Sequence, residues 1–134
     1  MNRIILYIIL LCGLASCSKM YCDEVEILNC EVSYPTSATS QNLTITFKNK
    51  SDKTIKDISF FCKFYSGFGT ECGIGFQADV NTAIEPNRVY TAHWSCPLYN
   101  WNIRKVKIEH IKVFYKGDTK YNIYEEGLFY LHYL

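Results

Sequence analysis

The residues that could take part in the widest range of chemistry in this sequence are its 7 cysteines. A cysteine thiol can act as a nucleophile, a metal ligand, a disulfide partner or an acylation site. Cys17 stands apart from the others because it directly follows an apolar run from Ile4 to Ala15 and a single Ser16. A run of this length is typical of the core of a secretion signal and is too short to span a bilayer. We therefore expect Cys17 to have a role of its own.

The segment Leu14-Ala15-Ser16-Cys17 resembles a bacterial lipobox. The resemblance implies that the Cys17 sulfur receives a diacylglyceryl group, that cleavage makes Cys17 the first mature residue, and that the freed amine is acylated. More than one acyl chain would hold the protein firmly, since each buried CH2 contributes about 0.8 kcal/mol. We expect a lipoprotein signal peptide over residues 1–16, lipidation at Cys17 and a tether over residues 17–25.

An ordinary secretory signal, cut near Ala15 or Ser16, is the alternative. It would release a soluble secreted binding or effector protein. Two Asn-x-Ser/Thr tripeptides, which begin at Asn42 and Asn49, match the acceptor motif for N-glycosylation. A secreted eukaryotic protein is therefore a further alternative.

The remaining mature cysteines are candidates for disulfides. Cys62 and Cys96 fall on the expected inward faces of two long strands, and a bridge between them would close a loop of about 35 residues, worth about 3–4 kcal/mol. Cys72 is a competing partner for Cys96. Cys22 and Cys30 could join the tether to the first strand. The alternative is that some of these residues are free, buried and inert thiols.

The sequence gives little support for a metal site or a catalytic site. The sequence has no Cys-x2-Cys pair, and His93 and Cys96, three residues apart on an expected strand, would point to opposite faces. His110 and His132 have no cysteine partner in the sequence. Catalytic motifs for serine hydrolases, phosphate-binding loops and zinc proteases are absent. We expect no enzyme, no catalytic residue, no metal and no cofactor; catalysis by a free thiol such as Cys72 is the rival hypothesis.

One expected loop has the composition of a binding site. Tyr99 and Trp101 alternate with Asn100 and Asn102 in the segment LYNWN. Exposed aromatic rings beside amides can stack on sugars or anchor a protein contact. The alternative is that the two rings cap one end of the fold.

The length and the net charge of the chain limit the number of domains and the kinds of partner that it can have. The chain has 134 residues, which suits one domain, and its formal net charge is +1. Loss of the leader removes Arg3 and leaves 13 basic against 13 acidic residues. A neutral chain lacks the positive excess that holds a nucleic-acid backbone, so nucleic acid is not an expected partner.

The mature chain shows a hydrophobic period of two, which is typical of strands, and 16% aromatic residues, which favour strands. The clearest strand is 42–48. Others are expected at 26–32, 54–65, 89–96, 104–115 and 120–124, with a short edge strand at 71–77. Breaks in the alternation predict bulges near Lys56-Asp57 and Glu109-His110. Glu85-Pro86-Asn87 predicts a turn. The tail, 125–134, could be a strand or a short helix.

An ordered series of residues runs through positions 42–121: Asn49, Thr54-Ile55, Tyr65, Phe68-Gly69, Pro86, Trp94 and the segment IKVFYKGDTKY. In this order and spacing the region resembles the small immunoglobulin-like domains, called FxLYD-like, of secreted and lipid-anchored bacterial proteins. Two departures are Ser66, where an acidic residue is usual, and the order of Gly117-Asp118. The resemblance implies an extracellular accessory module without a known common activity.

These observations predict an all-β, immunoglobulin-like sandwich of two antiparallel sheets over residues 26–134. We expect it to be lipid-anchored in the cell envelope, outside the cytoplasmic membrane of a bacterium, as a non-enzymatic binding or accessory module. Its expected partners are the membrane, through the lipid, and an unidentified protein or glycan.

Overall fold

The structure, a computed structural model, describes residues 24–33, 40–72, 75–97, 103–124 and 128–131. These residues form eight strands: β1 (Val25–Val32), β2 (Ser40–Asn49), β3 (Ile55–Ser66), β4 (Phe76–Val80), β5 (Val89–Pro97), β6 (Ile103–Tyr115), β7 (Asn122–Tyr124) and β8 (Leu128–Leu131). In these ranges no helix is long and apolar enough to cross a membrane.

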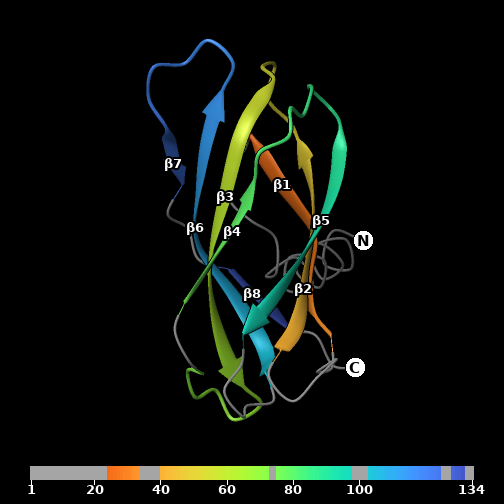
Figure 1. The fold of residues 1–134 in the computed structure, drawn as a ribbon, viewed down its shortest axis with the longest axis vertical. Coiled ribbons are helices and arrows are strands. Elements are labelled where there is room, and N and C mark those ends of the chain that lie inside the picture. The colour runs from red at the N-terminus through yellow and green to blue at the C-terminus, as the bar shows by residue number, and fades with distance from the viewer. Residues whose placement is uncertain (1–23, 34–39, 73–74, 98–102, 125–127, 132–134) are drawn as a thin grey trace, which may run out of the picture.

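The strands form two antiparallel sheets that face each other (Figure 1). One sheet has the order β1-β2-β5, and the other has the order β4-β3-β6-β7, with β8 also paired to β6. The second and fifth strands thus share a sheet while the third and sixth share the other, as in immunoglobulin-like domains. The expected all-β, immunoglobulin-like sandwich is confirmed.

The core lies between the sheets and follows the alternation of the sequence. On β2, Leu43, Ile45 and Phe47 are fully buried. Phe47 meets Phe60 of β3 across the interior, with ring centroids 5.1 Å apart. Burial of apolar area is the main stabilising contribution in such a small domain, at roughly 25 cal/mol per Å².

The first expected bulge is confirmed at the start of β3. Ile55 pairs with Tyr115 of β6 and Asp57 pairs with Phe114, which leaves Lys56 without a partner in the register. A bulge of this kind bends the strand and redirects a side chain. Lys56 is consequently exposed at the end of the sandwich.

The second expected bulge is confirmed in the middle of β6. Phe61 pairs with His110 while the next residue, Cys62, pairs with Ile108, so Glu109 is the extra residue.

The structure corrects the position of one expected edge strand and decides the secondary structure of the tail. The edge strand expected at 71–77 is wrong in position: β4 begins at Phe76, and only an isolated bridge joins Glu71 to Tyr65. A Cβ at Gly75 would lie 3.2 Å from the carbonyl oxygen of Cys62, so this glycine allows the chain to approach β3 closely before the strand begins. In the tail, β8 establishes a strand rather than a helix.

Asn49, the last residue of β2, is a fully buried polar residue whose side chain makes four hydrogen bonds. Its amide Nδ2 donates to the carbonyl oxygens of Lys53 (2.8 Å) and Ile84 (2.9 Å). Its Oδ1 accepts from the backbone N–H of Ser51 (3.0 Å) and from the Ser51 hydroxyl (2.6 Å). One side chain thereby joins the β2–β3 turn to the β4–β5 connection.

The backbone of Asn49 strengthens the same junction. Its N–H donates to the carbonyl oxygen of Arg88, and its own carbonyl oxygen accepts from the N–H of Asn87. Because the side chain is enclosed and fully hydrogen-bonded, the Asn49 tripeptide cannot serve as a glycan acceptor in the folded protein.

We expect replacement of Asn49 by Ala to lower the free energy of unfolding by about 3 kcal/mol, because the lost bonds leave buried backbone groups unsatisfied. Urea unfolding followed by circular dichroism measures this. The matched control is Asn42→Ala, at a half-buried asparagine whose side chain makes no hydrogen bond to the described residues; its effect should stay within about 1 kcal/mol. Equal losses for the two variants would contradict the assigned role of Asn49.

Glu24 forms a second long-range junction, at the start of β1. Its carboxylate Oε2 accepts a hydrogen bond from the Tyr115 hydroxyl (2.7 Å) and another from the Tyr124 hydroxyl. These two donors, followed by a smaller attraction from Lys53, outweigh desolvation and lower the pKa of Glu24. The clamp joins the first described residue to β6 and β7.

We expect Glu24→Gln to destabilise the protein near neutral pH and to matter less as the pH falls. The folded-state pKa of Glu24 is lowered, so its ionised form stabilises the fold above the ordinary glutamate pKa of about 4.3. That contribution is lost as the pH falls from there through the lower folded-state value. Urea midpoints of both proteins at several pH values measure it, and a pH-independent difference would contradict the prediction.

Candidate functional site

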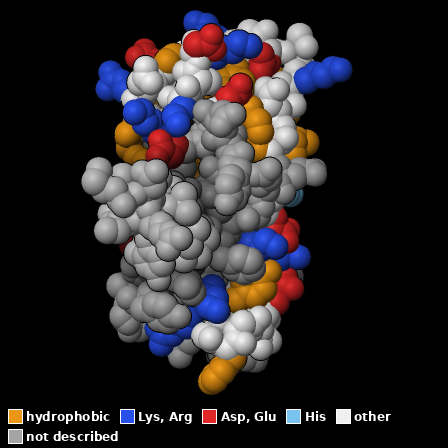
Figure 2. Space-filling view, turned by 180° about the vertical axis from the view of Figure 1, so that it is seen from behind, with side chains coloured by type: hydrophobic (Ala, Val, Ile, Leu, Met, Phe, Trp, Pro, Cys, Tyr) orange, Lys and Arg blue, Asp and Glu red, His pale blue; other side chains and the backbone are white. Residues whose placement is uncertain are grey.

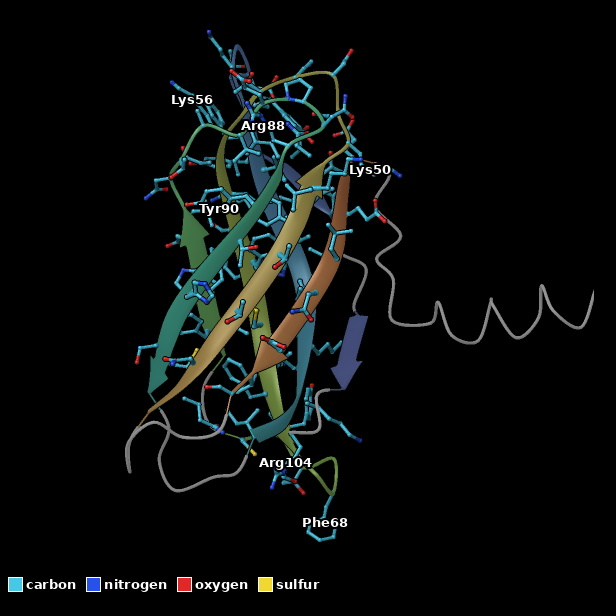
Figure 3. All side chains as sticks on the ribbon, turned by 90° about the vertical axis from the view of Figure 1, so that its right-hand side faces the viewer. Lys50, Lys56, Phe68, Arg88, Tyr90 and Arg104 are labelled. Carbon is cyan, nitrogen blue, oxygen red and sulfur yellow. The ribbon has the colours of Figure 1, made fainter. Side chains whose placement is uncertain are left out.

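A groove of about 640 Å³ lies at one end of the sandwich. We call it the end groove. It is lined by Thr54, Lys56, Thr82, Ala83, Ile84, Glu85, Arg88, Val89, Tyr90 and Lys116. Figure 3 shows Lys56 and Arg88 at this end of the molecule, with Tyr90 further along β5, while Phe68 and Arg104 lie at the opposite end.

Two lysines reach the end groove from neighbouring strands of one sheet. Lys56 is the extra residue of the bulge in β3, which lifts it out of the alternation of the strand. Lys116 directly follows β6, and its backbone N–H donates to the carbonyl oxygen of Thr54 (2.8 Å). The pairing of β3 with β6 therefore fixes the positions of both ammonium-bearing residues.

Arg88 reaches the end groove from the β4–β5 connection. Asn87 adopts a left-handed backbone conformation with φ of 65°, which asparagine tolerates better than most residues. The turn is closed by a hydrogen bond from the N–H of Arg88 to the carbonyl oxygen of Glu85 (3.2 Å), and Asn49 holds its far side. The turn expected at 85–87 is thus confirmed, and it places Arg88 at the start of β5.

Apolar side chains form part of the end groove beside these cations. Ile84 is buried, whereas Val89 is 53% exposed and presents its side chain to the solvent. The Tyr90 ring packs on Phe47 of the core, with centroids 6.0 Å apart. Its hydroxyl makes no hydrogen bond to the described residues.

The end groove carries a positive charge although the whole chain has a formal net charge of only +1. Its lining holds three cations, Lys56, Arg88 and Lys116, and one carboxylate, Glu85. Arg88 Nε lies 4.0 Å from Glu85 Oε2, and both side chains are mostly exposed, so this ion pair contributes little. Lys56 and Lys116 have no ion pair within the described part of the chain. In Figure 2 this end is uppermost, and charged side chains of both signs gather there.

Several residues expected to form sites lie outside the described residues. They are the lipidation candidate Cys17, the disulfide candidate Cys22, the loop aromatics Tyr99 and Trp101, and His132. The predictions made for them remain predictions.

The structure contains no disulfide among the cysteines it describes: Cys30, Cys62, Cys72 and Cys96 are free and buried. The bridge expected from Cys96 to Cys62 or Cys72 is therefore not formed, and Cys30 is not bridged. Cys62 and Cys96 lie on β3 and β5, in opposite sheets. Both side chains are buried, as expected for the inward faces of these strands.

Burial also sets the acidity of these thiols. Desolvation is the main cause that raises the pKa of Cys30 and Cys62, and the neighbouring Cys96 adds to the shift in both. Desolvation raises the pKa of Cys96 to about 12, against a smaller lowering by a hydrogen bond to the backbone of Leu43. Thiols in this state are protonated at neutral pH and are poor nucleophiles.

The described histidines have local structural contacts. His93 Nδ1 lies 2.9 Å from the Thr44 hydroxyl on the outer face of the β1-β2-β5 sheet. The His110 ring stacks on Phe61 at the second bulge, with centroids 3.9 Å apart. Among the described side chains, no group of three or more His, Cys, Asp or Glu residues is arranged to hold a metal ion.

The end groove was not predicted from the sequence. Its residues come from three parts of the chain that are far apart in sequence. The broken alternation at Lys56 was a local feature of the sequence that pointed to this region. The structure also reveals a fully exposed Phe68 at the tip of the β3–β4 turn, beside Gly69 with φ of 84°. From the sequence, Phe68 stood out only through the Phe68-Gly69 pair that carries the resemblance to FxLYD-like domains.

Comparison with known proteins gives no family. No family model matches the sequence, and no curated protein matches it. One similar solved structure is the X-ray structure of the Northeast Structural Genomics Consortium target SoR45, with 15% identity, a TM-score of 0.41, and coverage of 81% of this chain and 82% of that one. Another is beta-glucosidase 3B from Thermotoga neapolitana in complex with glucose, with 10% identity, a TM-score of 0.38, and coverage of 81% of this chain but 17% of that one. Likenesses this distant carry no argument about function.

We expect the native protein to resist thiol reagents at Cys30, Cys62 and Cys96. Peptide mapping after treatment with a maleimide at neutral pH should find these three residues unmodified, and the same treatment in denaturant should modify all of them. The reason is their burial and raised pKa values. Rapid modification of any of the three in the folded protein would contradict this arrangement and would favour the rival hypothesis of a catalytic thiol.

Proposed function

We propose that this protein is a lipid-anchored, non-enzymatic binding module of the cell envelope, and that the end groove is its binding site. The observation that carries the proposal is the end groove itself: a concave surface with an apolar part and cations fixed by a bulge and a hydrogen-bonded turn. Binding sites commonly combine apolar walls with a few positioned polar groups in this way.

The position of the tether supports the proposal. The chain enters the sandwich at the same end as the end groove, because the carbonyl oxygen of Glu24 accepts a hydrogen bond from the N–H of Lys50 (2.8 Å) in the β2–β3 turn. Seven residues separate Cys17 from the start of β1 at Val25, so a lipid on Cys17 would keep this end within about 30 Å of the membrane. The proposed module would take up its ligand close to the membrane surface.

The proposal assigns the anchoring to one sulfur. We expect Cys17→Ala to move the protein from the membrane fraction to the soluble fraction or to block its processing, because the neutral mature chain has no charge that would hold it to lipid. Cell fractionation with immunoblotting measures this, and intact-mass spectrometry of the native protein should show the added acyl groups.

The matched control is Cys22→Ala, which changes a second cysteine near the tether and should leave the protein in the membrane fraction. Wild-type protein in the soluble fraction, or a mature N-terminus without acyl groups, would instead support the soluble secreted alternative.

A further inference from the structure

We infer that the end groove binds a small molecule that carries a phosphate monoester on an apolar or aromatic body. The inference rests on the proposed function, since it names the ligand class of the same groove.

The charge of the lining matches this ligand. Lys56, Arg88 and Lys116 against Glu85 give a local excess of two positive charges. A phosphate monoester carries about −1.5 to −2 at neutral pH. Arg88 can turn from Glu85 to the ligand at little cost, because their ion pair is long and solvent-exposed.

The donors in the end groove also suit a phosphate. Each lysine ammonium offers three N–H donors and the arginine guanidinium offers a planar fork, and both groups recognise phosphate oxygens. The Tyr90 hydroxyl adds a donor that no described residue satisfies. Thr54 and Thr82 add hydroxyls to the lining.

The apolar part of the end groove indicates a ligand that has an apolar group in addition to its phosphate. The exposed Val89 side chain and the Tyr90 ring lie beside the cations in the same lining. Covering this surface with an aromatic or aliphatic group would remove apolar area from water, which favours binding.

The wider end of the molecule argues against a membrane surface as the occupant. Outside the end groove, Lys50 and Lys53 in the β2–β3 turn stand beside Asp52, and Lys53 Nζ lies 3.7 Å from Asp118 Oδ1. Lys120 in the β6–β7 connection is a further exposed cation at this end, and the carboxylate of Glu24 offsets its charge. The positive excess therefore lies in the end groove. A confined charge suits a small anion better than an extended sheet of headgroups.

The test is a titration of the mature, lipidated protein in non-ionic detergent with phenyl phosphate at constant ionic strength, measured by calorimetry. Inorganic phosphate, phenol and benzoate serve as comparison probes. We expect phenyl phosphate to bind more tightly than each of the three. Lys56→Gln and Lys116→Gln should each weaken its binding by about fivefold to tenfold.

The matched control is Lys50→Gln, an exposed lysine at the same end (Figure 3) that does not line the groove. It should bind phenyl phosphate as the wild type does, and all three variants should keep the wild-type circular dichroism spectrum. Equal weakening by Lys50→Gln would overturn the inference in favour of a non-specific surface charge, and so would the absence of phenyl phosphate binding.

Three further results of the titrations show which part of the inference is wrong. Tighter binding of benzoate would overturn the assignment to phosphate. Displacement of phenyl phosphate by vesicles that contain phosphatidylglycerol, but not by neutral vesicles, would overturn the small-molecule assignment. Phenol binding that a Tyr90→Ala variant abolishes, without phenyl phosphate binding, would overturn the inference and leave the proposed binding module standing.

Discussion

The buried amide of Asn49 is the constraint on which the functional end of this molecule depends. Its two N–H groups and its carbonyl oxygen are all hydrogen-bonded, and they join the β2–β3 turn to the β4–β5 connection. Backbone bonds from Asn49 to Asn87 and Arg88 extend the junction to the start of β5. A sandwich can form from its core alone, but connections without such a junction would sample many conformations. Because both connections supply walls of the end groove, Asn49 determines the shape of the proposed site.

The strands could be predicted from the sequence because each of them has its own periodic signal. Alternation identified the long strands, and its failure at Lys56 and Glu109 identified two of the four register shifts in the described strands; those at Leu28 and Arg104 were not predicted. The edge strand was misplaced because Gly73 and Gly75 weaken any pattern there. The clamp between Glu24 and two tyrosines, and the junction at Asn49, join residues that are distant in the chain, and no local pattern could show which partners they would meet.

The site was harder to predict than the fold for a physical reason. Cysteines and loop aromatics attract attention because their chemistry is strong, yet the described cysteines are sealed in the core as free thiols. The end groove is instead made of common residues, and its charge depends on three distant parts of the chain that meet at one end. The whole chain has a formal net charge of only +1, so its composition does not reveal the local excess of positive charge that folding produces.

The most direct test of this account is an experimental structure of the mature protein with phenyl phosphate. The account predicts that the phosphate lies in the end groove within hydrogen-bond distance of Lys56 and Lys116, with the Asn49 amide buried against the backbone of Ile84. A phosphate bound elsewhere on the molecule, or an Asn49 side chain turned to solvent, would contradict it.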